Sequence, residues 1–197
     1  RWNGTVEGLS DKPDRLILKN IRVDGNDWGC RADSAGNPLK ILFGINVGNG
    51  VTVIDSEIYA TTQVGITNTS GNALIKNNFI HDIKLNDSGW AVGIISQGSQ
   101  FKTIIENNKI LNTMIGISAT NVDISNNEII DNEVGINGDT SFGPGIISNN
   151  IFKNNKIAID TSGRTISNNE FIDNESISSD KGNNWIIDVK KFVPSET

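Results

Sequence analysis

The sequence predicts an all-β solenoid, a stack of about seven coils that each bury a thin apolar column. Three observations predict it: one line of residue types recurs, a small residue followed by isoleucine recurs beside it, and the apolar runs are short. The recurring line is clearest in residues 122–136, VDISNNEIIDNEVGI. Its copies begin with IKNN at Ile75, IENN at Ile105, ISNN at Ile124, ISNN at Ile147 and ISNN at Ile166.

The spacing of the copies indicates one coil per copy. The second asparagine of each pair falls at 78, 108, 127, 150 and 169, which gives intervals of 30, 19, 23 and 19 residues. Repeats of this length are typical of supersecondary units that are stable only when stacked. The apolar runs are too short for helices, are rich in β-branched residues and are punctuated by Asn and Gly. Each copy is therefore predicted to contain three short strands.

Coils stacked in register place each strand parallel to its counterpart, which favours right-handed winding. Asn tolerates the left-handed backbone of a sharp turn, and its amide can pair along a ladder of identical residues. The pattern resembles the family of right-handed parallel β-helices, the pectate-lyase-like solenoids whose coils carry an asparagine ladder at one turn. The likeness covers residues 40–178 and implies the fold. The resemblance does not indicate one function, because that fold hosts lyases, hydrolases, epimerases, phage tail spikes and surface proteins.

The 197 residues fit a single elongated domain. Residues 1–15 lack the repeat and are expected to be a cap or the remnant of a preceding coil, and residues 16–178 are expected to form the coils. Residues 179–197 are expected to be a C-terminal cap, in which Trp185, Phe192 and Val193 cover the open end of the last coil. The chain starts at Arg1 without Met or a visible signal peptide. We therefore expect it to be a mature product or part of a longer protein.

Composition excludes several classes of function. Hydrophobic residues make up 36% of the chain and the mean hydropathy is −0.26, which suits thin apolar columns better than a globular core. A net charge of −6 and a pI near 4.8 argue against a basic nucleic-acid-binding face and allow a neutral or cationic glycan, or calcium. No run of 18 apolar residues is present, so no membrane insertion is expected. The single cysteine, Cys30, excludes an internal disulfide framework.

A small residue followed by isoleucine marks the same strand of each coil. If the isoleucine points inward, strand alternation predicts that both its neighbours point outward. One sheet would then present a nearly bare face. Its outward row is predicted to be Asn46, Thr67, Ile95, Ser118, Asn137 and Asp160. The marks are Gly44-Ile45, Gly65-Ile66, Gly93-Ile94, Gly116-Ile117, Gly135-Ile136, Ala158-Ile159 and Ser176-Ile177.

Long turns are predicted to border this face on both sides. The turn entering the face is long at residues 24–40 and 81–91, and the turn leaving it is longest at 96–102 and 137–145. We expect these turns to flank a groove. The two entering turns carry acids beside tryptophans, namely Asp27, Trp28, Arg31 and Asp33 in the first and His81, Asp82, Asp87 and Trp90 in the second.

Glycan cleavage needs carboxylates that donate and accept protons around the anomeric centre, often with aromatic rings that pack on sugars. His81 is the only histidine, and histidine is the side chain most often used for proton transfer in enzymes, although capping or packing at the turn is its alternative role. Each single Asp, likewise, has an alternative role as a turn former. The predicted catalytic residues are Asp27, Asp33, His81, Asp82 and Asp87. The predicted substrate-binding residues are Trp28, Arg31, Asn46, Thr67 and Trp90.

No cofactor is expected, and calcium held by Asp24, Asp27 and Asp33 is the alternative. DGNDWG at 24–29 begins like a calcium loop, but Trp28 stands where an oxygen ligand belongs. The resemblance implies either a calcium-assisted lyase with a basic residue or a hydrolase with an Asp cluster, His and Arg. The N-T-D, G-H-G and R-I-K motifs of the related galacturonan hydrolases are absent, so no role transfers residue by residue.

The sequence therefore predicts an extracellular or cell-surface β-helix that cleaves a polysaccharide in the groove, with hydrolysis favoured over elimination. The alternative is a non-catalytic carbohydrate-binding or spacer module of a surface protein. The repeats are also similar to those of archaeal and bacterial surface proteins, including the associated domain of disaggregatase, which implies a cell-surface glycan as partner beside other domains of a longer chain. A third alternative is trimeric packing, as in phage tail spikes.

Overall fold

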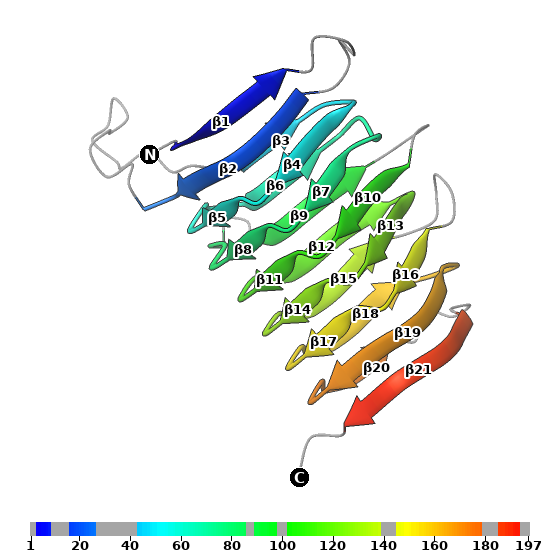
Figure 1. Cartoon of the computed structure of the whole chain (residues 1–197). Helices are drawn as coiled ribbons and strands as arrows, with labels where there is room; N and C mark the ends of the chain where they lie inside the picture. The colour runs from blue at the N-terminus through cyan, green and yellow to red at the C-terminus, as the bar shows by residue number, and fades with distance from the viewer. Residues whose placement is uncertain are drawn as a thin grey trace.

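The computed structural model describes residues 3–8, 16–26, 43–85, 89–97, 102–138, 145–178 and 185–193. Within these ranges the chain winds into a rod of stacked coils, with β1 at one end and β21 at the other (Figure 1). All strand pairs in this part of the chain are parallel except β1 with β2. The predicted all-β parallel solenoid is confirmed. No helix in the described ranges is long and apolar enough to cross a membrane.

Two rows of strands form the first two sides of the rod. The first row comprises β4 (Val51–Ile54), β7 (Leu74–Lys76), β10 (Thr103–Glu106), β13 (Val122–Ser125) and β16 (Ile146–Ser148). The second row comprises β5 (Glu57–Tyr59), β8 (Phe79–His81), β11 (Lys109–Leu111), β14 (Glu128–Ile130) and β17 (Ile151–Lys153). Two longer strands, β2 (Leu16–Asp24) and β19 (Thr165–Ile172), pair with both rows and join them into one sheet.

The third side is a separate sheet of seven strands. These are β3 (Phe43–Val47), β6 (Val64–Asn68), β9 (Val92–Gln97), β12 (Ile115–Thr120), β15 (Val134–Gly138), β18 (Ile157–Thr161) and β20 (Ser176–Ser178). In the described chain five coils, from β4 to β18, have three separate strands each, and the sequence prediction of about seven coils counted the less regular coils at the two ends as well.

The ends of the rod carry one further strand each. β1 (Asn3–Gly8) pairs antiparallel with β2, and β21 (Trp185–Val193) pairs in parallel with β19. The side chains of Trp185, Phe192 and Val193 lie outside the described part of the structure. Their predicted capping role therefore stays a prediction.

The core is a set of apolar columns inside the coils. Ile75, Ile105, Ile124 and Ile147 lie in register on adjacent strands and are fully buried. Two phenylalanines continue a second column, in which the rings of Phe152 and Phe171 stack at 5.2 Å between centroids. Because each coil contributes only a few such residues, the rod needs little apolar content.

Buried asparagines form a ladder at the corner between the first two rows. Asn127 donates its Nδ2 to Oδ1 of Asn150 (3.0 Å) and to the carbonyl of Ile105 (3.0 Å), and its Oδ1 accepts the backbone N–H of Asn108 (2.9 Å). The same side-chain contacts run along the corner, which confirms the predicted asparagine ladder. Its members are Asn78, Asn108, Asn127, Asn150 and Asn169, and Ser56 joins its start by donating its backbone N–H to Oδ1 of Asn78 (3.0 Å).

The first asparagine of each pair supplies the turn. Asn77, Asn107, Asn126, Asn149 and Asn168 have φ between 54° and 57°. Asn tolerates this left-handed backbone better than most residues. The repeated Asn-Asn pair therefore combines a turn-forming residue with a ladder residue.

A second ladder, which the sequence analysis missed, lies at the next corner. Asn132 donates its Nδ2 to Oδ1 of Asn155 (3.0 Å), and Asn155 donates to Oδ1 of Asn174 (2.9 Å). Thr113 begins this ladder by donating its hydroxyl to Oδ1 of Asn132 (3.0 Å). Each member lies five residues after a member of the first ladder, so this fixed spacing was the available signal.

The glycines before the inward isoleucines point into the coil, and the prediction that they point outward was wrong. A Cβ on Gly93 would lie 2.6 Å from the carbonyl oxygen of Gly116 and 2.7 Å from Cγ2 of the buried Ile110. The pairing of β6 with β9 skips the glycine of each strand, so strict alternation breaks there. The small residue is required because the next coil approaches closely.

One arginine is fully buried inside the rod. Arg164 donates from Nη1 to the carbonyl of Val122 (3.1 Å) and from Nη2 to the carbonyl of Ala119 (2.5 Å), more than 40 positions earlier in the sequence. It thus satisfies carbonyls where β12 ends and β13 begins. A buried guanidinium of this kind fixes the geometry of one corner.

We expect Asn127→Ala to lower the free energy of unfolding by about 3 kcal/mol, because it leaves buried donors and acceptors of the neighbouring coils without partners. Urea denaturation measures the change. Asn126→Gly is the matched control, since Asn126 is exposed and its φ of 57° suits glycine. Equal effects of the two substitutions would contradict a stabilising ladder.

A methyl group between coils is expected to be costly. Gly93→Ala places a Cβ against Gly116 and Ile110, and we expect a loss of about 1–3 kcal/mol from overpacking. Gly48→Ala is the control, because a Cβ there meets nothing within 4 Å. Thermal unfolding followed by circular dichroism should separate the two variants, and a Gly93→Ala protein as stable as Gly48→Ala would refute the close approach.

Candidate functional site

Of the ten predicted site residues, five fall in the described part of the chain. His81 and Asp82 end β8 and begin the following turn, Asn46 and Thr67 lie on the seven-stranded sheet, and Trp90 precedes β9. The other five, Asp27, Trp28, Arg31, Asp33 and Asp87, lie outside the described residues.

The structure gathers charged and aromatic side chains around His81 on the outer face of the second row. Strand β8 alternates, so Ile80 is buried in the core whereas Phe79 and His81 face outward. In-register pairing sets Tyr59 beside His81 and Asp24 beside Tyr59. We call this set the His81 cluster; its members are Arg22, Asp24, Glu57, Tyr59, Phe79, His81, Asp82 and Asn112.

Aromatic rings shield the imidazole of His81. The ring of Tyr59 stacks parallel to it, with 5.1 Å between centroids and 2° between planes. The ring of Phe79 lies 4.1 Å from it. The side chain of His81 is consequently only 15% exposed.

Both ring nitrogens of His81 face a carboxylate. Nδ1 lies 2.7 Å from Oδ2 of Asp82, and Nε2 lies 3.4 Å from Oε1 of Glu57. The Asp82 and Glu57 side chains are 49% and 38% exposed, so solvent reaches both acids. Asn112 donates to the other oxygen of Asp82 (2.5 Å), and Nε of Arg22 lies 3.0 Å from Glu57. The imidazole therefore bridges two accessible carboxylates.

A second chain of hydrogen bonds, through Tyr59, runs beside the contacts of His81. Tyr59 donates its hydroxyl to Oδ2 of Asp24 (2.5 Å) and accepts from Nη2 of Arg22 (2.9 Å). The other oxygen of Asp24 accepts the backbone N–H of Asn26 (2.9 Å).

These bonds set the ionisation of three groups. The bond from Tyr59 lowers the pKa of Asp24, and the same bond raises the pKa of the Tyr59 phenol. Hydrogen bonds from His81 and then Asn112 lower the pKa of Asp82. At neutral pH the cluster therefore contains anionic Asp24 and Asp82 and a protonated Tyr59.

The two long entering turns begin side by side next to this cluster. Lys84 donates its Nζ to Oδ1 of Asn26, and the backbone N–H of Gly25 bonds the carbonyl of Tyr59 (2.9 Å). The starts of the turns at 24–40 and 81–91 thus meet although they are 58 positions apart.

Sequence reasoning missed Glu57 and Tyr59. Both lie on β5, in a coil whose corner carries Ser56 in place of the ladder asparagine, so the repeat is least visible there. The available signal was the in-register position, because Tyr59 and His81 each end the second strand of their coil.

The outer face of the seven-stranded sheet is not bare along its whole length, contrary to prediction. Val64 and Val92 on this face are fully buried, and Ile95 is 6% exposed. These side chains form an outer apolar cluster with Ile115, and Trp90 packs against it. The sequence pattern predicted that this face is exposed, but an apolar layer outside the coil covers part of the face.

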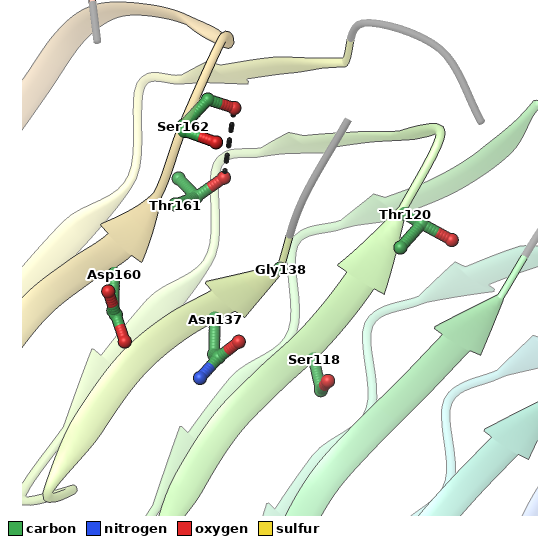
Figure 2. A pocket seen from close by; sticks show the side chains of 7 residues that line it. All are labelled: Ser118, Thr120, Asn137, Gly138, Asp160, Thr161 and Ser162. Atoms are coloured by element: carbon green, nitrogen blue, oxygen red, sulfur yellow. Dashed lines mark hydrogen bonds between the residues drawn. The ribbon is translucent and has the colours of Figure 1, made fainter. Parts of the chain in front are cut away.

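Farther along the same sheet the outward row opens into a polar pocket of about 350 Å³. Ser118, Asn137 and Asp160 lie in register on β12, β15 and β18 and point outward from neighbouring strands (Figure 2). The pocket is lined by Ser118, Thr120, Asn137, Gly138, Asp160, Thr161 and Ser162.

Among the described residues no group of three or more His, Cys, Asp or Glu side chains is placed to hold a metal ion. Asp24, named in the calcium alternative, bonds Tyr59 and Asn26 through its two oxygens. Its proposed co-ligands Asp27 and Asp33 lie outside the described ranges.

Comparisons with known proteins concern the fold. The family described as "Right handed beta helix region" matches residues 18–174. The crystal structure of a double mutant of the periplasmic alginate epimerase AlgG is similar, with a TM-score of 0.43 and 17% sequence identity over 78% of this chain and 42% of that chain. No curated protein matches the sequence.

The lowered pKa of Asp82 predicts a contribution to stability that acid removes. The contribution is complete above the unfolded-state value of about 3.9 and is lost as the pH falls through the lower folded-state value. Asp82→Asn removes the titrating group, so we expect its melting temperature to fall less steeply than that of the wild type between about pH 5 and pH 2. Parallel curves from thermal unfolding would contradict this linkage.

Proposed function

This chain belongs to the family of right-handed β-helix regions, and from that premise we propose that it is a polysaccharide-active domain whose substrate lies over the His81 cluster. The family fold alone does not define an activity, because its members carry unrelated functions on one scaffold. The observation that carries the proposal is the imidazole of His81, held between the accessible carboxylates of Asp82 and Glu57.

The arrangement supports acid–base chemistry on a glycosidic bond. Asp82 accepts a hydrogen bond from Nδ1–H of His81, which fixes the ring orientation. We propose that protonated His81 gives its Nε2 proton to the leaving glycosidic oxygen while a water molecule attacks the anomeric carbon and loses its proton to solvent, and that Glu57 beside Nε2 returns a proton to the ring afterwards. Hydrolysis is the reaction that this proton transfer supports. Elimination from a uronic acid would yield an unsaturated product instead.

The surroundings of the cluster supply contacts for a sugar chain. The Arg22 side chain is 62% exposed and places a cationic donor beside Glu57. The starts of the two long entering turns meet next to the cluster, where Lys84 bonds Asn26. The net charge of −6 favours a neutral or cationic glycan. We place this activity outside the cell or at its surface, where such polymers occur.

A non-catalytic glycan-binding or spacer module is the second candidate. The observation that favours it is that both ring nitrogens of His81 have carboxylate neighbours and that its ring stacks on Tyr59. Such contacts also suit a residue that ties adjacent coils together. The two candidates differ in whether glycan chains are shortened.

We expect His81→Gln and Asp82→Asn each to reduce the release of oligosaccharide ends by about 100-fold or more, because the first removes the proton donor and the second removes the carboxylate that orients it. The substrates are soluble xylan, chitosan, chondroitin and galacturonan, and the readouts are new reducing ends and the ultraviolet absorbance of unsaturated products.

Asp131→Asn is the matched control. Asp131 has φ 54° and accepts a hydrogen bond from Asn154 (3.0 Å), just as Asp82 has φ 53° and accepts from Asn112, but Ile130 takes the place of His81. Asp131→Asn should keep full activity. If the wild-type protein binds a glycan without shortening it, the non-catalytic alternative is supported and the enzymatic one is contradicted.

A further inference from the structure

We propose that a shallow hollow beside the His81 cluster holds one sugar unit of the glycan, and that this unit is a pyranose whose ring substituents are all equatorial. The inference rests on the proposed function, because the chain that enters the hollow is the one that lies over His81. It adds a binding position and a sugar geometry that the cluster alone does not define. We call this site the Phe79 hollow; it is lined by Asn77, Asn78, Phe79, Asn107 and Lys109.

The hollow lies where the ladder corner meets the second strand row. Phe79 begins β8 and Lys109 begins β11, and the two residues are paired in register on these adjacent strands (Figure 1). Asn77 and Asn107 precede the strands and hold the turns with φ of 54° and 55°. The site is therefore on a different side of the rod from the seven-stranded sheet. Its volume of about 400 Å³ is at the small end of ligand pockets and suits a single sugar ring.

The hollow and the His81 cluster share Phe79. Its ring lies 4.1 Å from the ring of His81 between centroids, at 25° between planes, and Phe79 also lines the hollow. Phe79 and His81 are two residues apart on one strand, which corresponds to roughly 7 Å along β8. This separation is close to the length of one sugar unit. A chain with one unit in the hollow therefore places the next linkage near His81.

Phe79 and Lys109 give the hollow apolar surface. The side chain of Phe79 is only partly buried, so part of its ring is accessible. Nζ of Lys109 lies 3.3 Å from Oε2 of Glu128, so its charge is balanced within the protein and its aliphatic stem offers the apolar surface. Contact of these groups with the C–H face of a sugar removes apolar area from water, which is favourable.

Amide groups supply the polar contacts of the hollow. Asn77 and Asn107 are exposed, and each side chain carries a donor and an acceptor. Nδ2 of Asn77 donates to Oδ1 of Asp55 (3.1 Å), which orients this amide before a ligand arrives. Sugar hydroxyls both donate and accept, so they can pair with either end of an amide. Binding therefore combines apolar contact with hydrogen bonds from amides.

The apolar surface selects the shape of the sugar. A pyranose with equatorial substituents presents axial C–H groups on its ring faces, as in β-1,4-linked glucose, xylose or glucosamine. An axial oxygen, as at C4 of galactose, puts a polar group on one face. Contact with a phenyl ring would take water from that oxygen without replacing its hydrogen bond, which is unfavourable. The hollow therefore favours gluco-configured chains over galacto-configured ones.

Titration calorimetry with cellotetraose and β-1,4-galactotetraose tests the selectivity, because these two neutral chains differ only in the configuration at C4. We expect the wild-type protein to bind cellotetraose about tenfold more tightly. Phe79→Leu removes the ring and should abolish this preference. Equal binding of the two chains by the wild-type protein, or an unchanged preference in a folded Phe79→Leu protein, would overturn the proposal.

Asn107→Gly tests the position of the hollow with little risk to folding, since glycine accepts the φ of 55° and only the amide side chain is lost. It should weaken cellotetraose binding about fivefold. Asn149→Gly is the matched control, because Asn149 is exposed, has φ of 57° and precedes β17 as Asn107 precedes β11, but does not line the hollow. Equal affinities of the two glycine variants would refute the site.

Cleavage assays on cellotetraose separate this inference from the proposed function. If Asn107→Gly weakens binding and the wild-type protein shortens no chain, the hollow stands and the proposed hydrolysis fails. If the chain is shortened with the same KM by Asn107→Gly and Asn149→Gly, the hydrolysis stands and the hollow fails. If Asn107→Gly alone raises the KM about fivefold, both stand.

Discussion

The hydrogen-bond ladder of buried side chains at the coil corners is the constraint on which the rest of the structure depends. Each amide in the series Asn108, Asn127 and Asn150 pairs with the next one and also bonds a backbone carbonyl. A coil that slipped by one residue would break these bonds and leave buried polar groups without partners, which is costly. The ladder therefore fixes the register between coils, and the apolar columns and the outer rows follow that register.

The same register turns a repeated structural unit into a candidate site. Asp24, Tyr59 and His81 are separated by 35 and 22 positions, yet they occupy equivalent places in three successive coils and lie next to each other. Stacking at strand spacing brings the rings of Tyr59 and His81 together, and hydrogen bonds from these two residues lower the pKa values of Asp24 and Asp82. The chemistry of the cluster arises from neighbours that coil stacking provides.

The seven-stranded sheet shows that one row can serve different roles along the rod. In the coils of β6 and β9 its outer side is covered and adds a small apolar layer with Trp90. In the coils of β12, β15 and β18 the row is polar and opens into the pocket. The close approach of coils at the inward glycines is common to both regions, so the difference lies in the outward side chains and their cover.

The sequence by itself determined the coil, the ladder corner and the register, because equivalent residues such as Asn78 and Asn108 recur at readable intervals. Only the tertiary structure decided that Gly93 points inward and that Val92 is covered, since these depend on an irregular strand and on contacts outside the coil. It also decided the partners of His81: Asp82 is adjacent in sequence, whereas Glu57 becomes a neighbour only when coils stack. Periodicity identifies equivalent positions, but the contacts made outside the coil depend on side chains that do not repeat.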